Sequence, residues 1–161
     1  MALTTFLWFD NNAREAAQFY VSIFPDSSLD SSWVTPAATP SNESDSEVSI
    51  SFTIFNSPFV ALNGGPLFRF NESISFQIPC VDQDEIDHYW HLLTRDGGEP
   101  GRCGWLKDKF GVSWQVTSPA MGAFLNGPAR AGARAATEAM IAMTKIDLDE
   151  LRRAYESAAT P

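Results

Sequence analysis

The chain has 161 residues, which is enough for one compact domain or for two closely fused half-size modules. Its net charge of −9, from 20 acidic and 11 basic residues, argues against nucleic acids and anionic membrane surfaces as partners, because both repel a negative surface. A hydrophobic share of 44% supports a packed core, but no apolar run approaches the roughly 18 residues of a membrane helix.

The first half of the chain predicts a strand, a helix and three further strands. The helix runs from about Ala13 to Phe24 and ends before Pro25. Residues 36–45, rich in Pro, Ala, Ser and Thr, predict a mobile surface loop. Ser57-Pro58 is interpreted as the turn between the third and fourth strands. The expected strands are Thr4–Phe9, Leu29–Thr35, Val48–Ile54 and Phe59–Asn63.

The second half repeats this order. A strand over Ile74–Ile78 precedes a helix over about Gln83–Arg95, which Gly97-Gly98 terminates. Two more strands, near Arg102–Leu106 and Val112–Thr117, are joined by the solvated hairpin tip Lys107-Asp108-Lys109. From Ala131 to about Ala158 the sequence predicts helix with a break near Lys145–Asp147, and its apolar side chains should pack on the core or on a second subunit.

Capping residues strengthen the interpretation as a repeat. Asn12 with Glu15, and Asp82 with Glu85 seventy residues later, both have the spacing of a capping box at a helix start. A strand-to-helix unit that occurs twice predicts two similar modules that bury a shared core and enclose a site between them.

Alternation along the strands separates an apolar face from a polar one. The apolar side is expected to face the helices, and Trp8 is assigned to it. Its other members are Val48, Ile50, Phe52, Ile54, Ile74, Phe76, Ile78, Val112, Trp114 and Val116. The polar face carries hydroxyls and amides, and its members are Ser49, Ser51, Thr53, Ser75, Gln77, Ser113, Gln115 and Thr117. Such a sheet, if curved, forms a polar but uncharged cleft.

Several segments resemble one known family. They are Trp8–Asp10, Phe19–Phe24, Leu62–Pro66, Asp82–Trp90, Cys103–Gln115 and Ala142–Asp147. These segments are similar to the PhnB-like family, which often carries the description 3-demethylubiquinone-9 3-methyltransferase and belongs to the vicinal-oxygen-chelate, or glyoxalase/bleomycin-resistance, superfamily. The resemblance implies an α+β fold in which paired βαβββ modules form a curved mixed sheet around a cleft, followed by a C-terminal helix.

The same resemblance implies a homodimer and sets the domain organisation. We expect one domain over residues 1–161, with a first module to about residue 66, a second over about 67–118 and a helical tail over about 119–161. Residues 1–5 lack the basic start and long apolar stretch of a signal peptide, and Cys80 and Cys103 are not closely spaced. We therefore expect a cytoplasmic protein with free thiols, with one disulfide as the alternative.

Enzymes of the superfamily usually hold a divalent metal with His, Glu or Gln on their first and last strands. Here residues 1–9 contain no such ligand, and the last strand offers only Gln115. His88 and His91 fall on the second helix and point away from its buried face. We therefore expect no catalytic metal and no cofactor.

Five residues are predicted to contact a ligand, and for three of them a structural role competes. Gln77 and Gln115 are amides on equivalent strands of the polar face. Trp105 either packs in the core or stacks on a planar ligand. Asn63 either caps a strand end or supplies an amide to the ligand. Lys107 either lies at a solvated tip or holds an anionic group.

The sequence thus predicts a module that binds a small polar or planar molecule in its cleft. The alternative is a metal-dependent lyase, isomerase or dioxygenase of the same superfamily. The methyltransferase activity in the family description has less support, because a methyltransferase usually has a Gly-rich turn after its first strand and this strand ends Asp10-Asn11-Asn12.

Overall fold

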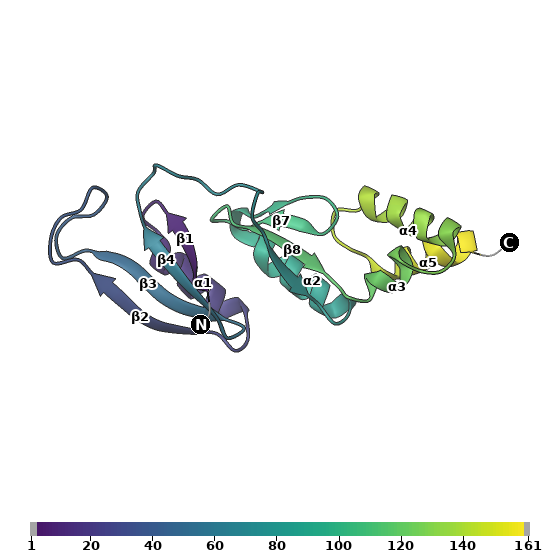
Figure 1. The fold of residues 1–161 in the computed structure, drawn as a ribbon, viewed down its shortest axis with the longest axis horizontal. Helices are drawn as coiled ribbons and strands as arrows, with labels where there is room; N and C mark the ends of the chain where they lie inside the picture. The colour runs from purple at the N-terminus through teal and green to yellow at the C-terminus, as the bar shows by residue number, and fades with distance from the viewer. Residues whose placement is uncertain (1–2, 160–161) are drawn as a thin grey trace. The chain divides into compact units, whose positions relative to one another are not determined.

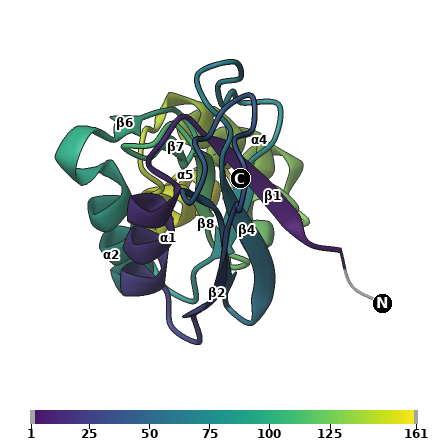
Figure 2. The same cartoon turned by 90° about the vertical axis from the view of Figure 1, so that its left-hand side faces the viewer.

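Both halves of the chain fold as a strand, a helix and three further strands, as the repeat predicts (Figure 1). The computed structural model describes residues 3–159. It divides into two compact units, Met1–Phe70 and Asn71–Pro161, called here the first and the second unit. In each unit, one helix lies against one face of its own four-stranded mixed sheet (Figures 1 and 2). The predicted α+β fold of paired βαβββ modules is confirmed.

The first unit has the strand order β1-β4-β3-β2. β1 runs parallel to β4, whereas β3 is antiparallel to both β4 and β2. Its elements are β1 (Thr5–Phe9), α1 (Ala13–Ile23), β2 (Ser28–Val34), β3 (Glu47–Ile54) and β4 (Ser57–Asn63).

The second unit has the equivalent order β5-β8-β7-β6, again with its first and last strands parallel. A short 3-10 turn, η1 (Arg95–Gly97), follows its helix. The other elements are β5 (Phe76–Pro79), α2 (Gln83–Thr94), β6 (Glu99–Pro100), β7 (Trp105–Lys107) and β8 (Ser113–Thr117). Both sheets therefore have the same connectivity, and the repeat in the sequence corresponds to a repeated βαβββ unit in the structure.

The core of the first unit lies between α1 and β3. The four apolar residues that alternate along β3 are all buried, as predicted. Tyr20 of α1 stacks on Phe52 with ring centroids 6.1 Å apart, and Phe52 stacks on Phe59 of β4 at 5.4 Å. The aromatic rings therefore join helix and sheet into one apolar layer.

Trp8 does not lie on the apolar face to which the sequence assigned it. Leu7 and Phe9 are buried, but Trp8 between them is only half-buried on the opposite side of β1. Its Nε1 donates a hydrogen bond to the carbonyl oxygen of Gly65 at 2.9 Å. A Cβ at Gly64 would lie 2.2 Å from the indole ring, so the contact with Trp8 requires glycine there.

Some predicted boundaries are wrong because the turns use positive φ. The β3–β4 turn is at Phe55-Asn56, with φ of 48° and 59°, whereas Ser57-Pro58 begins β4. In the second unit, Cys103 and Gly104 have positive φ and delay β7 until Trp105. β5 likewise begins two residues after Ile74, whose side chain is exposed and not part of the apolar face.

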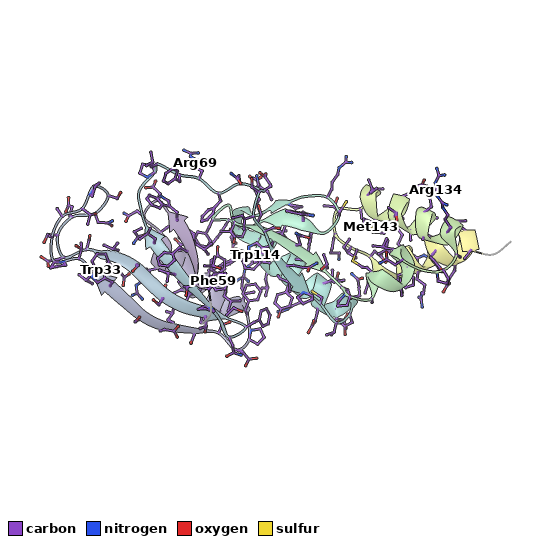
Figure 3. The ribbon with its side chains drawn as sticks, viewed as in Figure 1. Trp33, Phe59, Arg69, Trp114, Arg134 and Met143 are labelled. Carbon is purple, nitrogen blue, oxygen red and sulfur yellow. The ribbon has the colours of Figure 1, made fainter. Side chains whose placement is uncertain are left out.

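Asp108 does not lie at a solvated hairpin tip. The side chain is buried, and its Oδ1 accepts hydrogen bonds from the backbone N–H groups of Phe110 at 2.8 Å and Val112 at 3.1 Å. Its Oδ2 accepts the indole N–H of Trp114, a buried residue of β8 that Figure 3 labels, at 2.9 Å. The carboxylate therefore joins the β7–β8 connection to the core of the second unit.

The C-terminal segment forms α3 (Met121–Leu125), α4 (Arg130–Ala142) and α5 (Leu148–Ala159), with the predicted break between the last two. Backbone N–H groups of Cys103 and Gly104 donate to the carbonyl oxygens of Met143 and Thr144 at 2.9 and 2.8 Å. Ile146 is fully buried. The segment between α4 and α5 thus attaches the C-terminal helices to the rest of the second unit. No helix within residues 3–159 is long and apolar enough to cross a membrane.

Candidate functional site

Four of the five predicted ligand-contacting residues share one face of the second sheet, the face opposite α2. Gln77 of β5 pairs with Gln115 of β8, and Gln115 pairs in turn with Trp105 of β7. Lys107 pairs with Ser113 one step further along the same two strands. Because directly paired residues point to the same side of a sheet, Trp105, Lys107, Ser113, Gln115 and Gln77 form one surface.

The two glutamines are held by hydroxyl groups of the same face. Gln77 Nε2 donates to Thr117 Oγ1 at 3.1 Å, and Gln115 Nε2 donates to Ser75 Oγ at 2.8 Å. These bonds fix the orientation of both amides. The polar face predicted for this module is therefore ordered as well as polar.

A cavity of about 180 Å³ opens beside Trp105 and Lys107, entirely within the second unit. It is called here the β7 cavity. Its lining comes from β6, β7, β8 and the coil before β5, and consists of Glu72, Glu99, Pro100, Gly101, Trp105, Leu106, Lys107 and Ser113. The lining combines one aromatic ring, one ammonium, two carboxylates and one hydroxyl.

Ser113 distinguishes this cavity from an ordinary surface depression. The residue is 2% exposed, and among the buried side chains of residues 3–159 its Oγ is the one polar atom without a hydrogen-bond partner. A buried hydroxyl left unpaired destabilises a fold by about 1–3 kcal/mol. Ser113 also lines the β7 cavity, so this unpaired hydroxyl, which has almost no solvent-accessible surface, lies at the cavity wall.

Lys107 and Glu72 form an ion pair at the same cavity. Hydrogen bonding to Lys107 lowers the pKa of the Glu72 carboxyl, and the same bond raises the pKa of the Lys107 ammonium. Glu72 is 62% exposed at its side chain and Lys107 is 33% exposed. The cavity therefore contains a positive charge whose present partner is mostly in solvent.

We expect Ser113→Ala to raise the free energy of unfolding of the ligand-free protein by about 1 kcal/mol, because it removes an unsatisfied hydroxyl. Ser118→Ala is the matched control. Ser118 is also buried, but its Oγ accepts the N–H of Ala120 at 3.2 Å, so this variant should lose stability. Urea unfolding of both variants measures the difference, and a loss of stability in Ser113→Ala would show that the hydroxyl is paired.

Asn63 belongs to the first unit, and its side chain is occupied by the backbone. Its Oδ1 accepts the N–H of Ala13 at 2.9 Å and its Nδ2 donates to the carbonyl oxygen of Glu47 at 2.9 Å. Asn63 therefore caps α1. The predicted capping box at Asn12 is not formed, because the Asn12 side chain makes no cap hydrogen bond. At the second, Asp82 does cap α2, with its Oδ1 accepting the Glu85 N–H at 3.0 Å, while Glu85 Oε2 accepts the Val81 N–H at 2.9 Å.

Asn63 also lines a wider cavity of about 650 Å³ in the first unit. Residues 40–47 form one wall, and Asn42 Nδ2 donates to the Asn63 carbonyl oxygen at 2.8 Å. The carboxylates of Asp10 and Glu43 are exposed there. This cavity has the volume of a ligand site but no buried group that needs a partner.

The side chains described by the structure form no cluster of the kind that holds a divalent metal. Within residues 3–159, no three His, Cys, Asp or Glu side chains lie close enough together to hold a metal ion. His88 and His91 are exposed on α2, as predicted. The β7 cavity has two carboxylates, Glu72 and Glu99, and Glu72 is paired with Lys107; the rest of the face offers neutral amides and hydroxyls. Borderline and hard cations prefer several imidazole or free carboxylate ligands together.

Sequence reasoning missed Ser113 as a site residue, and it missed both glutamates. Alternation placed Ser113 on the polar face, but its lack of a partner depends on the packing around it. Glu72 precedes β5 in coil and Glu99 lies in a strand of two residues, so neither carries a periodic signal. Only the three-dimensional arrangement brings them to Lys107.

Two βαβββ modules of the same connectivity are the fold that the resemblance to the vicinal-oxygen-chelate superfamily implies, and the fosfomycin resistance protein FosX shares this fold. The family model described as 3-demethylubiquinone-9 3-methyltransferase matches residues 1–117, and the chain belongs to this PhnB-like family. The match ends with β8, so α3, α4 and α5 follow it. No curated protein matches the chain.

Solved structures agree with this assignment. The PhnB protein from Bacillus cereus is 30% identical, with a TM-score of 0.65 over 73% of this chain and 99% of that one. A Pseudomonas aeruginosa protein is 18% identical, with a TM-score of 0.58 over 73% and 97%. The fosfomycin resistance protein FosX from Listeria monocytogenes, in complex with Mn(II) and sulfate, is 17% identical, with a TM-score of 0.51 over 73% and 91%. The last two share the fold alone.

Proposed function

We propose that this protein binds a small polar or planar molecule in the β7 cavity, without a catalytic metal. The observation that carries the proposal is the buried, unpaired hydroxyl of Ser113 beside Trp105 and Lys107. Ligand sites are concave and combine apolar walls with a few converging polar groups, and this lining has that composition.

Each of the three side chains has a distinct role in this proposal. The Trp105 indole offers a flat surface to a planar ligand. Lys107 offers a charge-assisted hydrogen bond, and the Ser113 hydroxyl offers a neutral one. Gln77 and Gln115 continue the surface across β5 and β8, where a longer ligand would contact them.

A thermal-shift screen tests the proposal, using planar and polar metabolites and antibiotics with and without Mn²⁺, Zn²⁺ and Ni²⁺. We expect organic compounds to raise the unfolding temperature in the presence of a chelator, because no bound cation is needed. The rise should disappear in Trp105→Ala and persist in Trp33→Ala, which truncates an exposed tryptophan of the first unit.

Two outcomes would contradict the proposal. Stabilisation that requires the metal ion, followed by turnover, would identify a metal-dependent lyase, isomerase or dioxygenase instead. A shift that survives in both Trp105→Ala and Ser113→Ala would place the ligand elsewhere. Circular dichroism of each variant at 25 °C checks that its fold is retained.

Assembly and location complete the proposal. We infer a homodimer of single-domain chains, as the family resemblance implies, and a cytoplasmic location, in keeping with the free thiols of Cys80 and Cys103. Burial raises the pKa of the Cys80 thiol to about 12, so this cysteine is protonated and unreactive at neutral pH. Sedimentation equilibrium tests the dimer directly.

A further inference from the structure

Glu72 contributes a carboxylate to the β7 cavity from a segment outside the sheet. The residue lies in the coil that precedes β5, and its side chain reaches Lys107 of β7. We propose that this carboxylate occupies the position of a ligand carboxylate, and that the cavity takes a planar monocarboxylate about the size of one aromatic ring. This inference rests on the proposed function, because it names the ligand class of the same cavity.

The volume of the cavity sets the size of the ligand. Its 180 Å³ is slightly more than the roughly 150 Å³ of an engineered protein cavity that holds one benzene molecule. Gly101 leaves this space open. A Cβ at Gly101 would lie 2.8 Å from the Trp105 carbonyl oxygen, which accepts the Gly101 N–H at the same distance. The close approach of these two backbones therefore leaves the wall beside Trp105 without a side chain.

The charges of the lining set the chemical class. Lys107 is the one cationic residue of the lining, and it is paired with a carboxylate in the ligand-free state. A second carboxylate, Glu99, also acts on Lys107 and raises its pKa further. Lys107 is therefore already paired with one carboxylate where the ligand carboxylate would bind, and the unpaired hydroxyl of Ser113 lies at the wall of the same cavity.

Glu72 is loosely held and can leave. Exposed ion pairs add little to stability, because solvent screens them and long side chains lose rotamer freedom when paired. The coil before β5 lets the Glu72 side chain turn into solvent while the sheet stays fixed. A ligand carboxylate that is positioned by stacking on Trp105 would then replace it on Lys107. Glu72 thus competes with the ligand, and removing its charge should strengthen binding.

Calorimetric titration with benzoate tests this inference, with benzamide as the neutral isostere. We expect Glu72→Gln to bind benzoate about tenfold more tightly than the unsubstituted protein, because the competing charge is gone. Lys107→Met should weaken benzoate binding about tenfold and benzamide binding by a smaller factor, because only benzoate loses an opposite charge. Glu138→Gln is the matched control, because it also removes one carboxylate from an exposed ion pair of the second unit and should not alter benzoate binding.

Each outcome decides one question. Equal benzoate affinity in Glu72→Gln and in the unsubstituted protein, or benzamide binding as tight as benzoate binding, would overturn the carboxylate assignment. If benzoate fails to bind while other compounds still depend on Trp105 and Ser113, the proposed function stands and this inference fails. If no compound depends on Trp105 and Ser113, both fail.

Discussion

Replacing Asp108 by alanine is expected to lower the free energy of unfolding by about 3 kcal/mol, a large effect for one substitution. The buried carboxylate accepts three hydrogen bonds, from the N–H groups of Phe110 and Val112 and from the Trp114 indole. Alanine leaves the Trp114 Nε1–H buried without an acceptor, and it removes the two bonds that close the β7–β8 connection. Urea unfolding followed by circular dichroism measures the loss.

Two further variants test how much of this loss comes from the hydrogen bonds of the Asp108 carboxylate. Asp108→Asn keeps an acceptor for the turn but presents an NH₂ group to the Trp114 indole, so its loss should lie between those of the alanine variant and the unsubstituted protein. Arg134→Ala removes one partner of an exposed ion pair on α4 and should change stability by less than about 1 kcal/mol. A loss below about 1 kcal/mol in Asp108→Ala would refute the structural role assigned to the carboxylate.

The repeat was predictable because helix and strand periodicities are local properties of the sequence. The alternation over β3 identified its buried face correctly, and Asp82 with Glu85 identified the start of α2. Asn12 with Glu15 has the same spacing, but α1 is capped by Asn63, fifty residues away. Local pattern and tertiary contact compete for the same N–H groups, and the sequence does not show which of them forms the bond.

Turn positions were also predicted incorrectly from the sequence. Ser57-Pro58 is a typical turn dipeptide, yet the reversal occurs at Phe55-Asn56, where both residues have positive φ. Phe55 is an unusual residue for that conformation, and its ring contacts Phe24 with centroids 5.3 Å apart. A contact between distant aromatic residues thus accompanies a turn that local preferences do not indicate.

The sequence predicted the polar face of the second sheet, but it did not predict the β7 cavity beside that face. Alternation alone placed Gln77 and Gln115 on one surface, whereas the position of Trp105 on the same surface follows from its pairing with Gln115. The walls of the β7 cavity come from coil and from the two-residue strand β6, which have no period to detect. The unpaired state of Ser113 is a property of its whole surroundings, and so it appears only in three dimensions.

Gly104→Ala is expected to destabilise the protein by at least about 3 kcal/mol and to loosen the C-terminal helices. Gly104 has a φ of +81°, and a Cβ there would lie 2.6 Å from the Val116 carbonyl oxygen and 3.0 Å from Ile146 Cγ1. Its N–H donates to the Thr144 carbonyl oxygen, and its own carbonyl oxygen accepts the Val116 N–H. The added methyl group therefore strains the glycine and displaces both β8 and the segment that docks α4 and α5.

Gly97→Ala isolates the effect of backbone strain. Gly97 also has positive φ, but the nearest atom to its added Cβ is 3.9 Å away, so only the conformational penalty of about 1–2 kcal/mol applies. Amide hydrogen exchange should show faster exchange across α4 and α5 in Gly104→Ala and unchanged exchange there in Gly97→Ala, because only the first variant displaces Ile146. Equal losses of stability in the two variants would mean that the contact with Val116 and Ile146 relaxes freely. In that case the tail would be held by its helices and not by the segment after α4.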